Sequence, residues 1–293
     1  MITLNNIEIT SHVFPNGESY IDLPNSILAT VRATGSYEID FRFESNQDIW
    51  DLMLIVDKLK NKNCPIHLKM FYVPYSRMDR QEECRLFSLK TFANLINSMP
   101  FASVTIMEPH SDVTPALFDK VRVIDMSMRL AYEVLKDNFG IVYTLDNLEE
   151  VNKQMAEKKV CFVWPDAGAD KRYHKQFKGS QTMTCAKERD FDTGWMVTKY
   201  LIGADSHQDC EHVIIVDDLC SRGGTFIGAA KKLRELLPNL KTISLCVAHC
   251  ENTIEDGEIL KTDLINQVYT TDSLLNIDLA KLMKYDKLYV KNL

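Results

Sequence analysis

The sequence lacks long hydrophobic runs. No segment approaches the roughly 18 unbroken apolar residues that a membrane span needs. The N-terminal stretch MITLNNIEIT also lacks the basic flank and apolar core of a secretory signal. We therefore expect a protein without a membrane partner, located in the cytoplasm.

An excess of positive charge is also missing. The chain has 34 Lys and Arg residues against 41 Asp and Glu residues, which gives a net charge of −7. Proteins that coat nucleic acid are usually basic. We therefore expect no nucleic-acid partner, and any phosphate binding should be confined to a local site.

Paired cysteine motifs are absent. None of the eight cysteines forms a C-x-x-C pair, and several lie in apolar runs; they are Cys64, Cys84, Cys161, Cys185, Cys210, Cys220, Cys246 and Cys250. In a reducing compartment such cysteines act as small core hydrophobes. We expect neither a structural zinc site nor a disulfide framework.

What the sequence does contain is an alternation of short apolar runs with helical patterns. With 293 residues, of which 45% are hydrophobic, the chain is long enough for two domains with their own cores. The order indicates an α/β protein with largely parallel sheets. The predicted strands are 67–75, 103–110, 160–168, 212–218 and 243–250, and the predicted helices are 48–61, 87–99, 126–138 and 225–237.

Two further segments define the expected organisation. The first forty residues, with FPNGESYIDLP, are typical of a β-hairpin. A polar segment containing Gly140 lies between residues 138 and 150 and is suited to link two domains. We therefore expect one domain over 1–140 and a second over 141–293.

The stretch VIIVDDLCSRGGTFIGAAKKL, residues 213–233, combines a buried strand, a glycine-containing turn and a helix. Backbone N–H groups at a helix N-terminus bind phosphate, and Gly223 and Gly224 have no Cβ to keep an anion away. Asp217 and Asp218 would accept hydrogen bonds from two neighbouring sugar hydroxyls. The alternative is a capped helix whose acids are only solvated.

Other polar residues also follow predicted strands. Arg77 and Arg80, in FYVPYSRMDRQEECR, would hold a polyphosphate or stack on a base; the alternative is a solvated loop. His110 and Asp166 each stand at the end of a strand, where an imidazole and a carboxylate can share a divalent ion that also binds phosphate oxygens. Taken singly, His110 also fits a packed or surface histidine.

Six motifs in order, FPNGE, YSRMDR, MEPH, WPDAGADKR, AKER and VDDLCSRGGT, make the chain resemble the ribose-phosphate pyrophosphokinase family from about residue 14 to about residue 250. The resemblance implies two phosphoribosyltransferase-like domains, each with a mainly parallel central sheet flanked by helices. The N-terminal domain would bind ATP and the C-terminal domain ribose 5-phosphate.

The resemblance implies an ATP site in the first domain. Phe14 would pack on adenine, and Asn16 and Glu18 would reach the nucleotide, although the family usually has aspartate at position 16. Arg77 and Met78 would also lie at the nucleotide, where the family usually has glutamine in place of methionine. His110 would contact ATP and, with Asp166, hold Mg²⁺.

For the second domain the resemblance implies three elements. One is a pyrophosphate loop consisting of Asp166, Ala167, Gly168, Ala169, Asp170 and Lys171. Another is a flexible catalytic loop in which Lys187 is the catalytic lysine and Arg189 its partner. Finally, Asp217 and Asp218 would hold the ribose hydroxyls, and the 5-phosphate would bind to Ser221, Arg222, Gly223, Gly224 and Thr225. The family usually has Asp-Thr at positions 221 and 222.

The implied reaction transfers the diphosphoryl group of ATP to the anomeric hydroxyl of ribose 5-phosphate, giving 5-phosphoribosyl 1-diphosphate and AMP. The resemblance also implies a homo-oligomer, either a dimer or a hexamer. Three alternatives stay open: a phosphoribosyltransferase that consumes the diphosphate, a non-catalytic synthetase-associated subunit, and a plain nucleotide-binding module. FPNGE and YSRMDR argue against the first, and Lys187 and Arg189 against the second.

Overall fold

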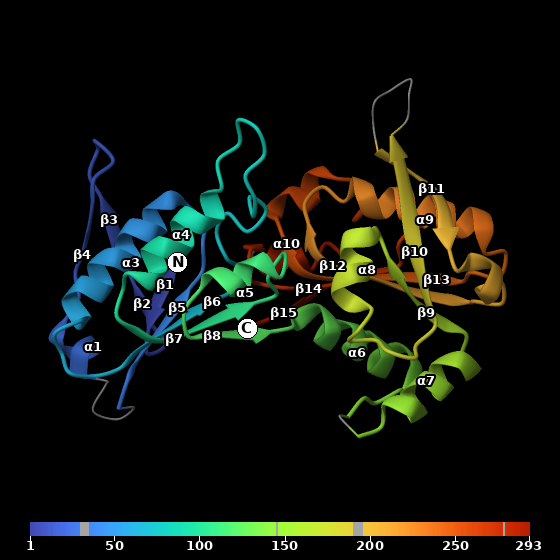
Figure 1. Cartoon of the computed structure of the whole chain (residues 1–293), viewed down its shortest axis with the longest axis horizontal. Helices are drawn as coiled ribbons and strands as arrows, with labels where there is room; N and C mark the ends of the chain where they lie inside the picture. The colour runs from blue at the N-terminus through green and yellow to red at the C-terminus, as the bar shows by residue number, and fades with distance from the viewer. Residues whose placement is uncertain (30–34, 145, 190–195, 278) are drawn as a thin grey trace. The chain divides into compact units, whose positions relative to one another are not determined.

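A computed structural model of the chain describes residues 1–29, 35–144, 146–189, 196–277 and 279–293. The chain forms two compact units, Met1–Ile124 and Asp125–Leu293 (Figure 1). The division falls before the boundary expected at 140/141, because α6 (Met126–Phe139) packs on strands of the second unit. The polar segment around Gly140 follows the end of this helix and does not separate the two units. Gly140 caps the helix in the left-handed conformation.

The first unit is built on a six-stranded sheet in the order β2-β1-β5-β6-β7-β8. Strands β5 to β8 are parallel, and β1 and β2 add an antiparallel edge. The strands are β1 Ile2–Leu4, β2 Ile7–Ile9, β5 Tyr37–Phe41, β6 Ile66–Met70, β7 Phe101–Met107 and β8 Val121–Ile124. The helices are α1 Asn25–Ala29, α3 Asn46–Leu59, α4 Ser88–Asn97 and α5 Val113–Leu117. The expected hairpin is present as β3 Ser11–Val13 and β4 Ser19–Ile21.

Helix α3 shows how sequence directs this unit. Its buried residues Leu52, Ile55, Val56 and Leu59 recur at helical spacing and therefore share one face. At the N-terminus the carboxylate of Asp48 accepts the Ser45 backbone N–H at 2.8 Å, which satisfies an amide that the helix leaves unpaired. The apolar face packs into the core of the first unit.

The second unit is built on a seven-stranded sheet in the order β11-β10-β9-β12-β13-β14-β15, in which β11 alone runs antiparallel to its neighbour. The strands are β9 Val160–Trp164, β10 Thr182–Arg189, β11 Met196–Ile202, β12 His212–Cys220, β13 Thr242–Cys250, β14 Gln267–Thr271 and β15 Leu288–Lys291. Besides α6, the helical segments are α7 Leu148–Glu157, α8 Ala167–Tyr173, η1 Ala204–His207, α9 Gly224–Leu236, η2 Asn252–Asp256 and α10 Leu279–Leu282.

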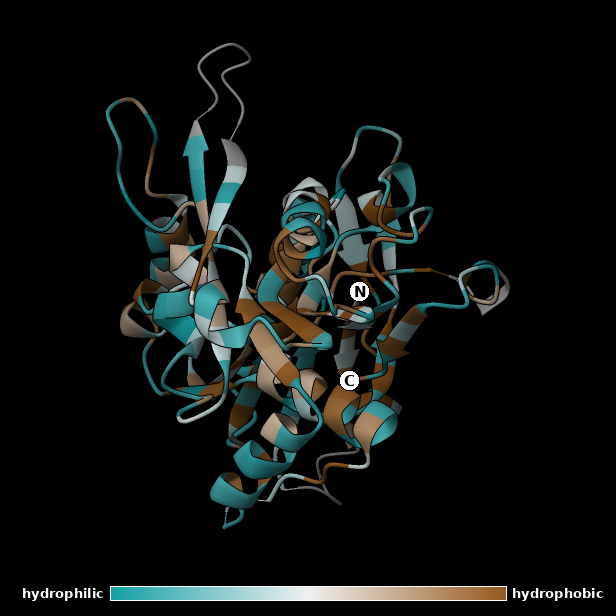
Figure 2. Cartoon of the chain, turned by 90° about the vertical axis from the view of Figure 1, so that its right-hand side faces the viewer, coloured by the Kyte–Doolittle hydropathy of each residue, from teal (hydrophilic) through white to brown (hydrophobic). Residues whose placement is uncertain are grey.

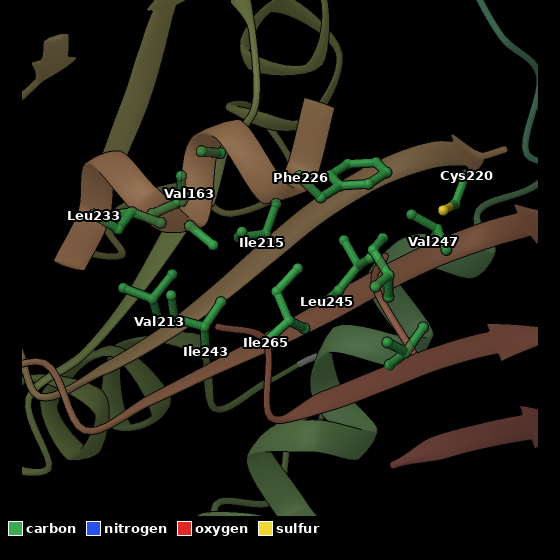
Figure 3. Packing of buried hydrophobic residues seen from close by; sticks show 14 of the residues in the cluster. Val163, Val213, Ile215, Cys220, Phe226, Leu233, Ile243, Leu245, Val247 and Ile265 are labelled. Atoms are coloured by element: carbon green, nitrogen blue, oxygen red, sulfur yellow. The ribbon is translucent and has the colours of Figure 1, made fainter. Parts of the chain in front are cut away.

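Both faces of this sheet are buried. On β12, Val213 and Ile215 face one core with α9, and Ile214 and Val216 face the other with α6, α7 and α8. Figure 3 shows the first core, where Phe226 and Leu233 of α9 lie over these strands. Hydrophobic residues are accordingly frequent in the central strands, while much of the outer helix surface is hydrophilic (Figure 2). A sheet covered on both faces explains why its strands read as continuous apolar runs.

The predicted fold class is confirmed, and each predicted strand and helix is present. The strands predicted over 67–75 and 160–168 are shorter, because β6 ends at Met70 and β9 at Trp164, and Ala167 already begins α8. Six cysteines are buried, Cys64 is partly buried and Cys84 is exposed, and all eight are free thiols. One expectation was wrong in form: Lys187 lies in strand β10 and not in a loop. Among the described residues no helix is both long enough and apolar enough to cross a membrane.

Candidate active site

Two strands of the second unit bring carboxylates to one edge of the sheet: Asp166 follows β9, and Asp217 and Asp218 lie near the end of β12. Strands β9 and β12 are parallel, with Val163 opposite Ile215, so Asp166 and Asp217 follow the paired region at the same edge. The Asp217 carboxylate accepts the backbone N–H of Asp218 at 2.9 Å. Burial and the nearby charges of Asp218 and Asp166 raise the pKa of Asp217 well above its ordinary value. This edge therefore concentrates negative charge.

Asp166 is held from two sides. One carboxylate oxygen accepts the N–H groups of Gly168 and Ala169, both at 3.0 Å, and so caps helix α8. The other oxygen lies 3.0 Å from the Lys187 ammonium. Burial alone would raise the pKa of Asp166, but these hydrogen bonds and the Lys187 charge hold it below its ordinary value. The expected pyrophosphate loop is thus the first part of a helix tied to the expected catalytic lysine.

Lys187 reaches this edge because β10 joins the sheet beside β9, the strand that Asp166 follows. The pairing of β10 with β11 shifts register between Ala186 and Lys187, where Lys199 of β11 is the extra residue. Residues 190–195 and the Arg189 side chain lie outside the described residues, so the expected role of Arg189 stays a prediction.

The glycine-containing loop after β12 has the form of an anion site. Gly223 caps α9 with a φ of +80°, a conformation that favours glycine, and Gly224 and Thr225 follow in the first turn, where helical N–H groups have no partner in the helix. The Arg222 side chain is exposed. The Ser221 hydroxyl is hydrogen-bonded to Thr253 at 2.9 Å, so its side chain holds the loop against the turn after β13.

In the first unit the hairpin places the residues expected at adenine on its tip. Phe14 is 50% exposed, and its ring centroid lies 5.2 Å from that of Tyr20. The Asn16 amide donates to the Glu18 carboxylate at 2.8 Å. An aspartate at position 16 would place a second negative charge beside Glu18, so asparagine preorganises this carboxylate without a bound ligand.

Two motifs of the first unit meet through Asp79. Its carboxylate accepts the Ser111 hydroxyl at 2.6 Å and Arg80 Nε at 3.2 Å. Burial opposes ionisation of Asp79, but these bonds and the nearby Arg80 and His110 charges keep its pKa below the ordinary value. Arg77 and Met78 are exposed beside it. The structure thus brings YSRMDR to the loop that carries His110.

The expected site residues fall in both units. Phe14, Asn16, Glu18, Arg77, Met78 and His110 belong to the first, and the others belong to the second. His110 and Asp166 are in different units, so a shared Mg²⁺ stays a prediction. Within the described part of the chain, no group of three or more His, Cys, Asp or Glu side chains is arranged to hold a metal ion.

Sequence reasoning missed Asp79 and Arg172. Both stand inside quoted motifs, which was the available signal, but their roles depend on partners that only folding brings near. Asp79 joins two loops, and Arg172 lies 2.7 Å from the Asp218 carboxylate.

Comparison with known proteins identifies relatives, although no family model matches the sequence. The ribose-phosphate pyrophosphokinase of Sulfurisphaera tokodaii is 30% identical over 239 residues, covering 78% of this chain and 72% of that protein. The enzyme of the same name from Mycoplasmopsis pulmonis is 25% identical over 97% of this chain and 82% of its own length.

A solved structure supports the fold. The crystal structure of phosphoribosylpyrophosphate synthetase from Mycobacterium smegmatis aligns with a TM-score of 0.69 over 97% of this chain and 86% of that one, at 19% identity. The resemblance carried by the six motifs is therefore confirmed at the level of sequence and fold. The chain belongs to the ribose-phosphate pyrophosphokinase family.

Proposed function

We propose that the chain transfers the diphosphoryl group of ATP to ribose 5-phosphate, forming 5-phosphoribosyl 1-diphosphate and AMP. The observation that carries the proposal is the sheet edge of the second unit. There Asp217 and Asp218 stand beside the Gly223 helix cap, and the ion pair of Lys187 with Asp166 lies at the same edge. Sugar hydroxyls, a 5-phosphate and a diphosphoryl group each have matching partners in this arrangement.

In the proposed reaction the anomeric oxygen attacks the β-phosphorus. A new oxygen–phosphorus bond forms, the bond from that phosphorus to the α–β bridging oxygen breaks, AMP leaves with the electron pair, and the hydroxyl proton is released. Such transfers depend mainly on positioning and on stabilising charge on the phosphoryl oxygens. Lys187 is suited to stabilise that charge once it exchanges Asp166 for the diphosphoryl oxygens. Arg189 is its proposed partner.

The remaining residues are proposed to bind. Asp217 and Asp218 orient the ribose, and the backbone amides at Gly224 and Thr225, with Arg222, hold the 5-phosphate. Phe14 and Glu18 receive the nucleotide from the hairpin, and Arg77 supports it.

Mg²⁺ is the proposed metal, and Asp166 and His110 are the residues proposed to hold it. Mg²⁺ keeps several waters and is usually held by one or two carboxylates together with substrate phosphates. Asp166 offers such a carboxylate, and His110 would contact the ion's water shell. When bound, the ion would neutralise phosphate charge.

The deciding experiment incubates the purified chain with ATP, MgCl₂ and ribose 5-phosphate and follows the products by ³¹P NMR and nucleotide chromatography. The proposal expects AMP and 5-phosphoribosyl 1-diphosphate, with no turnover after chelation of the divalent ion. The Lys187→Ala variant, purified identically, should lose nearly all turnover and so controls for contaminating enzymes. Formation of ADP would place attack at the γ-phosphorus and refute the reaction. Consumption of added 5-phosphoribosyl 1-diphosphate with a free base would instead indicate a phosphoribosyltransferase.

Assembly and location belong to the same proposal. We propose a cytoplasmic homo-oligomer, a dimer or a hexamer, with neither a membrane nor a nucleic-acid partner. Light scattering after size exclusion measures the assembly directly, and a monomeric mass in active fractions would rule the oligomer out.

A further inference from the structure

Arg172 makes a buried ion pair with one of the two strand-end aspartates. It lies in α8, one residue beyond the expected pyrophosphate loop, and its Nη1 is 2.7 Å from Asp218 Oδ1. The two side chains are 19% and 7% exposed. A charge pair so shielded from water is screened little, and removing one partner leaves the other with a large desolvation cost. Arg172 therefore fixes the position of the Asp218 carboxylate.

The next residue of α8 reaches the other aspartate by a second route. The Tyr173 hydroxyl donates to Ser127 Oγ at 3.3 Å. The Ser127 hydroxyl in turn donates to the Asp217 backbone carbonyl oxygen at 2.7 Å. Tyr173 and Ser127 are both completely buried. The end of α8 thus holds the carboxylate of Asp218 and, through Ser127, the backbone of Asp217.

We infer that Arg172 is a positioning residue that sets the Asp218 carboxylate for the two ribose hydroxyls, so that it determines selectivity for ribose over deoxyribose phosphates. The inference rests on the proposed function. Its physical reason is the crowding of acids: Asp218 and Asp166 both act on Asp217, and Arg172 is the partly buried cation paired with Asp218. Without that cation, the neighbouring carboxylates repel each other and Asp218 loses its fixed orientation.

The effect should be specific to one chemical feature of the substrate. A carboxylate held in place accepts hydrogen bonds from the 2- and 3-hydroxyls, and 2-deoxyribose 5-phosphate lacks the first of these. Charge-assisted hydrogen bonds of this kind contribute about tenfold or more in affinity. The ratio of the two affinities therefore reports on the placement of Asp218, whereas a general loss of stability would weaken both sugars alike.

The experiment measures binding of ribose 5-phosphate and of 2-deoxyribose 5-phosphate by calorimetry, and the KM values for ATP and ribose 5-phosphate, in the full chain. Arg172→Met should shrink the ribose preference by about tenfold and raise the KM for ribose 5-phosphate while the KM for ATP changes less than about twofold. Arg172→Lys, which keeps the charge but not the fork geometry, should recover part of the preference.

Arg234→Met is the matched control. Arg234 lies in α9 of the same unit, where its guanidinium donates to the Leu264 carbonyl oxygen at 3.1 Å, away from the strand-end aspartates. This variant should lose stability without changing the ribose preference. An Arg172→Met chain with unchanged ribose preference and an unchanged KM for ribose 5-phosphate would overturn the inference, as would equal losses for ATP and ribose 5-phosphate in the same variant. Failure of the wild-type chain itself to bind or convert ribose 5-phosphate would instead refute the proposed function.

Discussion

At the residue scale, the Asp217 carboxylate is proposed to bind the ribose, but its charge destabilises the folded chain because it is buried near other acids. Asp217 has a pKa raised by burial and by neighbouring acids, so the unfolded chain releases this proton at a lower pH than the folded chain. Stability is therefore lost as pH rises from the ordinary carboxyl range through the folded pKa. Asp218, by contrast, is paired with Arg172.

We predict that Asp217→Asn stabilises the chain at pH 8 while weakening ribose 5-phosphate binding. The amide oxygen still accepts the Asp218 N–H, but the buried charge is removed. A gain of about 1 kcal/mol would raise the melting temperature by about 2–4 °C, and the gain should shrink at pH 5. Scanning fluorimetry at both pH values measures it. Asp218→Asn should have the opposite sign, because it deprives Arg172 of its counter-charge; destabilisation by Asp217→Asn at both pH values would contradict this account.

Arg222 is the second residue-scale test, because the family usually has threonine there. Its guanidinium is exposed beside the helix cap and adds a positive charge near the proposed 5-phosphate. Arg222→Thr should weaken ribose 5-phosphate binding about three- to tenfold and reduce its dependence on salt, with little change for ATP. Titrations at low and high NaCl measure both effects. Unchanged affinity and salt dependence would show that the backbone amides and Thr225 bind the phosphate without Arg222.

At the element scale, the phosphate loop is supported by the turn after β13. The Ser221 hydroxyl bonds to Thr253, and Gly257 packs so closely that an added Cβ would overlap the Arg222 backbone carbonyl. The shape of the loop therefore depends on a segment about thirty residues away in sequence, which sequence motifs alone do not reveal.

Gly257→Ala should consequently displace the loop from a distance. Overpacking against backbone costs about 1–3 kcal/mol, and ribose 5-phosphate binding should weaken with it, because the Gly224 and Thr225 amides move with Arg222. Gly224→Ala is the matched control for stability, since a Cβ there meets no atom within 4 Å and alanine favours a helix. Chemical denaturation measures both free energies of unfolding. Equal stability of the two variants would show that the turn does not support the loop.

At the scale of the whole molecule, each unit has a core of its own. The first unit holds one hydrophobic cluster, and the sheet of the second unit separates two. Helix α6 contributes Leu130, Ala131, Val134 and Leu135 to one of the latter, each at most 1% exposed. Lys291 of β15 also pairs with Glu133 of this helix. The helix is thus part of the second unit's core and not a linker.

We predict that residues 125–293 fold by themselves, whereas residues 141–293 do not. Removing α6 uncovers a sheet face and loses several buried side chains at about 1.5–3 kcal/mol for each large one, against a total stability of about 5–15 kcal/mol. Circular dichroism melts of the two fragments measure the difference. A cooperative melt of 141–293 at the temperature seen for 125–293 would restore the boundary at 140/141.

The sequence by itself determined the α/β class, the principal strands and helices, and the family. Each of these properties depends on residues that are close together in the sequence. Apolar runs such as Val213–Val216 indicate strands buried on both faces, helical spacing indicates α3 and α9, and the order of the six motifs indicates the family. The gathering of Asp166, Asp217 and Asp218 at one edge also followed, because parallel strands end at one edge, although β12 continues past the two aspartates to Cys220.

Only the tertiary structure decided which of these side chains pair. Arg172 and Asp218 are far apart in the sequence, and their ion pair requires α8 to pack over β12. Lys187 reaches Asp166 because β10 joins the sheet beside β9. Helix α6 belongs to the second unit because it packs on β12, β13 and β14. Long-range pairing depends on the order of strands and on packing between layers, which local periodicity does not encode.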